Sequence, residues 1–299
     1  MFKFQREQRI LEIGGVRIGG QPGELPTVLI GSLFHVGHKI VKDRKTGAFD
    51  RRRAEDLIRV EEEMSEKTGV PCMLDVVGDN AESLIRYVDF VSDMTDMPFL
   101  VNGPEMSTRI VAIEHAIKSG LGDRAIYTSM NYTIKDTEIQ AIKRTGVKAA
   151  IIQSFGPRNL RPEGMVSMLK ELLQAASGAA IEKPLLLISV LDVPSISVSA
   201  RGVHVAKQEF GLPTGTAPMG VVGQWSRVQE LGEHAKESCR TSAAALAQAM
   251  GANFLIYGSV AKAREVFPAC AMVDATIAYN ARDFGVKPLT KDHPLYKIF

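Results

Sequence analysis

The stretch that decides the fold is PCMLDVVGDNAESLIRYVDFVSDMTDMPFLVNG, residues 71–103. It holds one near-continuous apolar run at 72–77, interrupted by Asp75, and a second apolar run at 98–101. Between these runs, residues 81–92 carry apolar side chains at helical spacing. A near-continuous apolar strand followed by a helix and another such strand is typical of a parallel sheet that is buried on both faces. The stretch therefore predicts a β–α–β unit.

The same alternation of short apolar runs and amphipathic stretches continues along the chain. We expect eight strands, at residues 27–34, 72–77, 98–101, 124–127, 149–153, 184–191, 219–222 and 253–257. We expect helices between them, at residues 50–68, 81–92, 106–119, 134–144, 163–176, 199–210 and 238–250. Eight such units, with no linker rich in Pro, Gly or Ser, predict an α/β fold with a single (β/α)8 TIM barrel and favour it over a doubly wound sheet.

A β-hairpin is expected near the start of the chain. Two short alternating runs, at 10–13 and 16–18, flank Gly14 and Gly15. We expect this hairpin to close one end of the barrel. The whole chain, 1–299, is then predicted to be one domain. It divides into a hairpin extension at 1–26, a barrel core at 27–262, and a C-terminal helix and tail at 263–299.

Composition excludes several classes of protein. Of 299 residues, 45% are apolar, and 36 Lys and Arg nearly balance 34 Asp and Glu, so nothing indicates binding to nucleic acid or to an anionic membrane. Three cysteines form no disulfide framework. No apolar run approaches the ~20 residues of a membrane span, and the first residues do not resemble a signal peptide. We therefore expect a soluble cytoplasmic protein.

The candidate site is the set of polar residues that follow the predicted strands. In (β/α)8 barrels the reactive side chains come from the carboxyl ends of the strands. Here they are mostly amides and hydroxyls, with few carboxylates, and such a lining suits a flat polar heterocycle. Some of them could equally cap helices, Asn80, Thr128 and Ser129 above all. The full set is Ser32, His35, Asp75, Asp79, Asn80, Asn102, Thr128, Ser129, Asn131, Gln153, Ser154, Asp192, Gln224, Trp225 and Ser259.

Motifs that would indicate a metal site, a nucleotide site or a nucleophile give only weak signals in this sequence. His35 and His38 have ligand-like spacing, but zinc needs a third protein ligand and no Cys or His cluster supplies one, so we expect no metal. The glycine-rich run at 13–20 matches no nucleotide-binding pattern. Cys72 begins a buried strand and is interpreted as a small hydrophobic residue. Trp225 could stack on a ring or act as a packing anchor.

Four stretches resemble a known family. VRIGGQPGE at 16–24, GHKIV at 37–41, DRAIY at 123–127 and VFPA at 266–269 resemble the H subunit of tetrahydromethanopterin S-methyltransferase. They are also similar to its relatives, the methylcobalamin:tetrahydrofolate methyltransferases of glycine betaine demethylation, which we expect to be the nearest group. The resemblance extends in order from the first residues to about Ala278.

The resemblance implies a pterin-binding methyltransferase barrel that forms a homodimer. The implied reaction moves a methyl group from a methyl-Co(III) corrinoid to N5 of tetrahydrofolate, giving 5-methyltetrahydrofolate. The alternative is a non-catalytic or tetrahydromethanopterin-specific subunit of a larger methyltransferase complex. Because the D-x-H-x-x-G pattern of many cobalamin domains is absent from the sequence, we expect the corrinoid to arrive on a separate protein.

The resemblance also implies roles for strand-end residues. Asp192 matches the family carboxylate, which would accept hydrogen bonds from the pterin N3–H and exocyclic amine. Asp75 is expected to be a further polar group beside the pterin. The catalytic candidates are Asp192, Asn131 and Gln153. The substrate-binding candidates are Asp75, Asn102, Thr128, Ser129, Asn131, Gln153, Asp192, Gln224 and Ser259.

The sequence departs from the family pattern at three places. Asn102 stands where Asp is usual, and Thr128 stands where Asn is usual. The Ala-Pro-x-Asn pattern reads APMG at 217–220, so Gln224, Asn131 or Gln153 would have to face N5. Arg158 and Arg161 could meet a folate glutamate tail or be ordinary solvated charges. A barrel for dihydropteroate synthesis is disfavoured, because the sequence indicates no strand-end set of Lys and Arg for a pyrophosphate.

Overall fold

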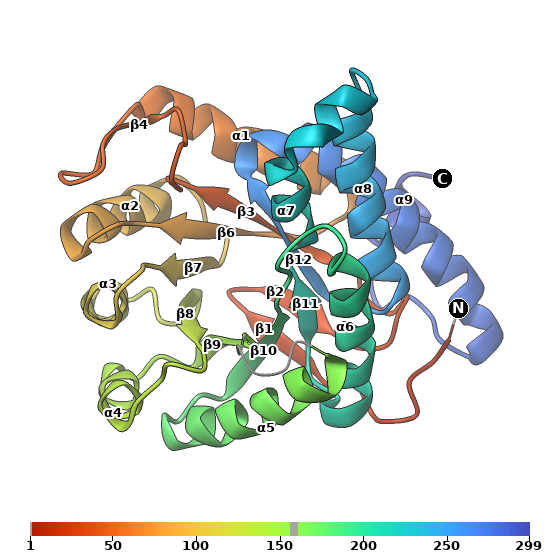
Figure 1. The fold of residues 1–299 in the computed structure, drawn as a ribbon, viewed down its shortest axis with the longest axis horizontal. Helices are drawn as coiled ribbons and strands as arrows, with labels where there is room; N and C mark the ends of the chain where they lie inside the picture. The colour runs from red at the N-terminus through yellow and green to blue at the C-terminus, as the bar shows by residue number, and fades with distance from the viewer. Residues whose placement is uncertain (1, 156–160) are drawn as a thin grey trace.

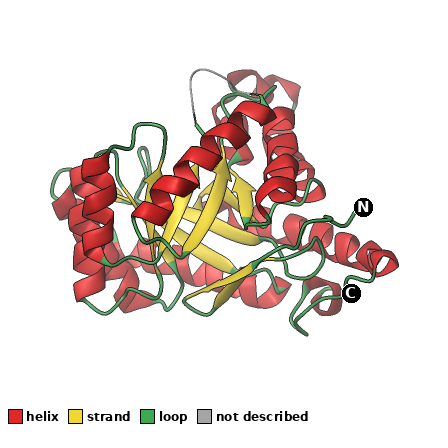
Figure 2. Cartoon of the chain, turned by 90° about the horizontal axis from the view of Figure 1, so that it is seen from below, coloured by secondary structure: helices red, strands yellow, loops and turns green. Residues whose placement is uncertain are grey.

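A computed structural model describes residues 2–155 and 161–299, and within them eight parallel strands close into a barrel surrounded by helices (Figures 1 and 2). Around the barrel the strands follow the order β10-β11-β12-β3-β6-β7-β8-β9. The predicted (β/α)8 TIM barrel is therefore confirmed. The strands are β3 (Val28–Leu33), β6 (Cys72–Val77), β7 (Phe99–Asn102), β8 (Ala125–Met130), β9 (Ala149–Gln153), β10 (Lys183–Ile188), β11 (Thr214–Thr216) and β12 (Phe254–Ser259).

Helices follow the strands and cover the outside of the barrel (Figure 1). The first is capped at both ends, since the Asp50 side chain accepts from the Arg53 N–H and Gly69 ends the helix in the left-handed conformation. The helices are α1 (Arg51–Thr68), α2 (Ala81–Met94), α3 (Met106–Lys118), α4 (Asp136–Thr145), α5 (Pro162–Gly178), α6 (Ile196–Phe210), α7 (Pro218–Gln224), α8 (Ala235–Ala249), α9 (Ala263–Ala281) and α10 (Pro294–Lys297), with short 3-10 turns at η1 (Ser226–Leu231), η2 (Val260–Lys262) and η3 (Arg282–Phe284). Among the described residues, no helix has the length and apolar character of a membrane span.

The barrel interior is a packed apolar core that the N-terminal hairpin closes. The hairpin consists of β1 (Ile10–Ile13) and β2 (Val16–Gly19), paired antiparallel as the Gly14-Gly15 signal predicts. Three of its side chains, Leu11, Ile13 and Ile18, pack against the interior residues, so the hairpin closes the barrel at the amino ends of the strands. The interior residues are Val28, Ile30, Met73, Leu100, Ile126, Ala149, Ile151, Leu185, Leu187 and Phe254.

The prediction of the seventh strand at 219–222 is wrong. The strand is β11, only three residues long, and Pro218 begins helix α7 over the predicted segment. Gly215 in β11 lies so close to β12 that an added Cβ would be 2.2 Å from the Phe254 carbonyl oxygen. A glycine forced by such contact removes the apolar signal by which a buried strand is recognised. The sixth strand also ends earlier than predicted, at Ile188.

A buried lysine lies near the hairpin end of the barrel. Lys207 of α6 is fully buried, and its Nζ donates to the Gly20 carbonyl at 2.9 Å and to Asn253 Oδ1 at 2.5 Å. Burial lowers the pKa of this ammonium group from 10.5 to about 7. The folded protein therefore loses this proton near neutral pH, well below the pH at which a free lysine loses it.

The lowered pKa of Lys207 predicts that the free energy of unfolding increases with pH. Between about pH 7 and 10 the unfolded chain binds the Lys207 proton and the folded chain has released it, so the free energy of unfolding increases as pH rises. Relative to Lys207→Met, we expect the wild type to gain roughly 1–3 kcal/mol between pH 7 and 9. Urea unfolding of both proteins across this range measures the difference. A difference that does not change with pH would contradict the lowered pKa.

Candidate functional site

A layer of polar side chains lies above the apolar interior at the carboxyl ends of the strands. Successive side chains of a strand point to opposite faces, so a residue two positions beyond an interior residue also faces inward. This rule selects one residue in each of five strands, above Ile30, Met73, Leu100, Ile126 and Ile151 of the interior. We call these five residues the mouth ring: Ser32, Asp75, Asn102, Thr128 and Gln153.

Asp75 is the polar centre of the mouth ring. Its side chain is buried, and each carboxyl oxygen accepts one hydrogen bond. Ser32 Oγ donates to Oδ2 at 2.7 Å, and Asn102 Nδ2 donates to Oδ1 at 2.9 Å. Burial raises the pKa of the Asp75 carboxyl, and the bonds from Ser32 and Asn102 oppose that rise. Three neighbouring strands, β3, β6 and β7, thus hold one carboxyl group in a fixed orientation.

Two further predicted residues meet on the other side of the mouth ring. Ser129 Oγ donates to Gln153 Oε1 at 2.9 Å, joining β8 to β9. The Gln153 side chain can therefore offer a ligand its NH2 donor and the second lone pair of its carbonyl oxygen. Thr128 is buried and its Oγ1 donates to the Ile126 carbonyl at 3.4 Å. Of the substrate-binding candidates, the structure brings Asp75, Asn102, Thr128, Ser129 and Gln153 to the mouth.

The structure sets Asp192 and Asn131 apart from this arrangement. Asp192 is exposed, four residues beyond the end of β10, and its Oδ1 accepts from the Ser195 N–H at 2.9 Å. Asn131 Oδ1 accepts from the N–H and the hydroxyl of Thr133, so its carbonyl stabilises the turn after β8. Asp192 shares a pocket of about 410 Å³ with Gln224. The role of Asp192 as the pterin carboxylate therefore stays a prediction. The Asp75 carboxyl is better placed for that role, because it lies in the mouth ring.

Three buried polar atoms at the same end of the barrel lack partners. His35 Nε2, Ser154 Oγ and Ser189 Oγ make no hydrogen bond within the described part of the chain. Ser189 directly follows β10 and lies two positions beyond the interior residue Leu187. Unsatisfied buried polar groups are costly, and a ligand with donors and acceptors on its edge would satisfy them. Ser189 is not among the residues predicted from the sequence, because the sixth strand was expected to extend past it.

The two histidines after β3 stabilise their own loop. Their rings stack with centroids 4.6 Å apart, and His38 Nδ1 accepts from the Phe34 N–H at 3.1 Å. Burial lowers the pKa of His38 to about 4, so this ring is neutral at physiological pH. Over residues 2–155 and 161–299, no group of three or more His, Cys, Asp or Glu side chains is placed to hold a metal ion.

Two polar residues after β6 have structural partners. Asp79 pairs with Arg44, which lies between β4 (Val41–Asp43) and β5 (Ala48–Phe49). Asn80 caps α2, since its side chain accepts from the Ser83 N–H and the Ser83 hydroxyl forms the reciprocal contact. The capping interpretation of Asn80 is therefore confirmed. Arg158 lies outside the described residues.

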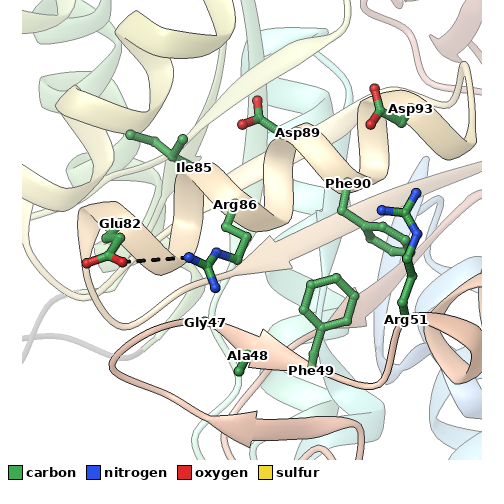
Figure 3. Close-up of a pocket in the computed structure, with 10 residues that line it drawn as sticks. All are labelled: Gly47, Ala48, Phe49, Arg51, Glu82, Ile85, Arg86, Asp89, Phe90 and Asp93. Carbon is green, nitrogen blue, oxygen red and sulfur yellow. Dashed lines mark ion pairs between the residues drawn. The ribbon is translucent and has the colours of Figure 1, made fainter.

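A pocket of about 670 Å³ lies outside the barrel, between β5 and α2 (Figure 3). Phe49 and Phe90 form its apolar floor, and Glu82 and Arg86 make an ion pair at its rim. Its residues come from α2, the start of α1 and the segment around β5, with no contribution from a barrel strand. The mouth ring, and not this flank, is therefore the candidate active site.

Comparisons with known proteins show which family the chain resembles. The family described as Tetrahydromethanopterin S-methyltransferase MtrH subunit matches residues 6–289. The chain is 37% identical, over the full length of both proteins, to the H subunit of tetrahydromethanopterin S-methyltransferase from Methanothermobacter marburgensis. It is also 37% identical, over 99% of both chains, to the H subunit of the putative methyltransferase mtx from Methanosarcina barkeri.

Solved structures of dihydropteroate synthases have the same fold. The enzyme of Xanthomonas albilineans, in complex with indole-2-carboxylic acid and 6-chloroguanine, matches 90% of this chain and 98% of its own, with a TM-score of 0.61. The enzyme of Thermus thermophilus, in complex with 6HMPPP, matches 88% of this chain and 98% of its own, with a TM-score of 0.54. Sequence identities of 16% and 14% make this a likeness of fold alone.

Proposed function

Because the chain belongs to the family of tetrahydromethanopterin S-methyltransferase H subunits, we propose that it binds a reduced pterin in the barrel mouth for methyl transfer. The methyl group passes between N5 of that pterin and the cobalt of a corrinoid carried by a separate protein. The observation that carries the proposal is the buried Asp75 carboxyl, fixed by Ser32 and Asn102 above an apolar barrel floor.

The mouth ring fits the edge of a pterin. Each Asp75 oxygen accepts one protein hydrogen bond and has a further lone pair, so the carboxylate can also accept from the ring N3–H and the exocyclic amine. Gln153 offers an NH2 donor across the mouth, and Ser189 offers an unpartnered hydroxyl. Donors and acceptors on opposite sides match a heterocycle that has both along its edge.

In this proposal the residues of the mouth ring position the reactants and form no covalent bond with them. N5 forms its new bond with its own lone pair, the cobalt–carbon bond breaks with its electron pair going to cobalt, and N5 releases its proton to water. In the mouth, Asp75 and Asn102 fix the plane of the pterin, which holds N5 at a set depth below the docking partner. Holding two reactants at about 3–3.5 Å in line can supply much of a rate enhancement.

Two pterins are candidates. The names of the relatives favour tetrahydromethanopterin, and we propose it as the first candidate. Tetrahydrofolate, the prediction from the sequence, is the second, because Asn102 and Thr128 replace the usual family residues and change which groups face the ring. We propose that the partner of this chain is a protein that carries the corrinoid. The homodimer that the family resemblance implies stays a prediction.

A side-by-side assay tests the proposal. The purified chain is mixed with methylcobalamin and either tetrahydromethanopterin or tetrahydrofolate, and the loss of methyl-cobalt absorbance is followed. We expect turnover with at least one pterin, and the faster reaction identifies the natural class. Binding of a pterin without turnover would favour the non-catalytic pterin-binding subunit. Failure to bind either pterin would overturn the proposed function.

A further inference from the structure

A third cavity, of about 420 Å³, adjoins the mouth ring. It lies between the end of β12, helices α7 and α8, and the loop after β3. Ser32 lines this cavity and also donates to Asp75, so the cavity borders the proposed pterin site. Ser259, a predicted substrate-binding residue, lines it as well.

The lining of this cavity is cationic. Lys236 and Arg240 enter from α8, and Lys262 enters from η2 after β12. Within the described residues, the lining contains no Asp or Glu side chain. We call this cavity the cationic pocket. The sequence-based expectation that no set of Lys and Arg lies at the strand ends is therefore wrong, because two of these cations come from a helix that follows the misplaced seventh strand.

The three cations have different partners. Arg240 is buried and makes two bonds to Glu265, Nε to Oε1 at 2.9 Å and Nη2 to Oε2 at 3.0 Å. This pair neutralises Arg240 and fixes the start of α8. Lys236 and Lys262 are half-buried and make no ion pair with any described residue. Two half-buried cations that lack an anionic partner in one cavity form a site at which an anion interacts favourably with both.

A buried histidine atom points to a ligand in the same cavity. His35 lines the cationic pocket, and its Nε2 is buried without a partner among the described residues. Its Nδ1 lies 2.8 Å from the Val36 carbonyl, which can only accept, so Nδ1 carries the proton. Nε2 is therefore the ring atom left to bond a group that fills the pocket.

We propose that the cationic pocket binds a phosphate group of one of the two methyl-transfer reactants, held by Lys236 and Lys262. This inference rests on the proposed function. Two sources share this chemistry, the phosphate in the tail of tetrahydromethanopterin and the phosphodiester in the nucleotide loop of a complete corrinoid. Point-charge lysines suit phosphate without demanding bidentate geometry.

Inorganic phosphate is the first probe, because it tests the pocket apart from the methyl transfer. Calorimetric titration at fixed ionic strength is expected to show saturable binding that Lys236→Gln/Lys262→Gln weakens by about tenfold or more. Lys118→Gln is the matched control, since this exposed lysine lies in the last turn of α3. Absence of saturable phosphate binding, or equal weakening in the control, would overturn the proposal while leaving the pterin assay unaffected.

Truncated reactants distinguish the two sources. If the pterin tail fills the pocket, the double variant raises the KM for tetrahydromethanopterin about tenfold and leaves unchanged the KM for a tetrahydropterin without a phosphate. If the corrinoid fills it, the KM rises for methylcobalamin and not for methylcobinamide, which lacks the nucleotide loop. Unchanged KM values for all four compounds would overturn the proposal.

Discussion

Replacing Asp75 by asparagine is expected to weaken binding of the pterin by about 10- to 100-fold. The amide removes one acceptor and presents NH2 to a site where Asn102 Nδ2 or Ser32 Oγ already donates. A hydrogen bond to a charged group contributes about 1.5–3 kcal/mol, and an unpaired buried donor adds its own cost. Titration of the purified variant with the reduced pterin, followed by quenching of protein fluorescence, measures the loss.

Asp192→Asn is the matched control for this change. Asp192 is exposed, and among the described residues its carboxyl accepts only from Ser195 of its own loop, so we expect the pterin affinity of Asp192→Asn to stay near that of the wild type. A melting temperature close to the wild-type value would show that Asp75→Asn remains folded. If Asp192→Asn lost affinity and Asp75→Asn kept it, the carboxylate of the site would be the one expected from the family resemblance.

The sequence predicts the barrel well where the strand signal is strong. Residues 72–77 and 149–153 are predicted to the residue, because buried parallel strands are continuous apolar runs. It fails at β11, where close contact with Phe254 requires Gly215 and leaves only three residues in the strand. No local pattern reports this requirement, since it comes from β12, a strand far beyond Gly215 in the sequence.

The candidate site is predictable in part for the same reason. Asp75, Asn102 and Gln153 lie inward because each follows an interior residue by two positions, and the strand ends there were located well. Asp192 was expected at the mouth because the sixth strand was extended to 191, whereas β10 ends at Ile188. Because β10 ends three residues earlier than predicted, Asp192 lies in a loop and not in the mouth ring. Ser189 takes the inward position instead.

A second large effect is expected at a buried ion pair behind the mouth. Arg109 of α3 donates to Glu138 at 2.8 Å and to the Tyr127 hydroxyl at 3.0 Å, and the side chains of the ion pair are at most 9% exposed. The same guanidinium donates to the carbonyls of Gly103 and Pro104, which directly follow Asn102. This network therefore joins the ends of β7 and β8 to helices α3 and α4.

Arg109→Met is expected to lower the free energy of unfolding by about 3–5 kcal/mol, because it leaves the Glu138 carboxylate buried without its cation. Urea unfolding measures the loss. In Arg109→Met/Glu138→Met much of it should be recovered, since replacing both partners of a buried pair with apolar side chains is often close to neutral.

Arg201→Met is the control, because Arg201 and Glu163 form an exposed pair whose removal should cost little. A loss at Arg109 no larger than at Arg201 would mean that water reaches the buried pair. The strand ends that present Asn102 and Thr128 would then be fixed by the barrel hydrogen bonds alone, and the pterin affinity of Arg109→Met would equal that of the wild type.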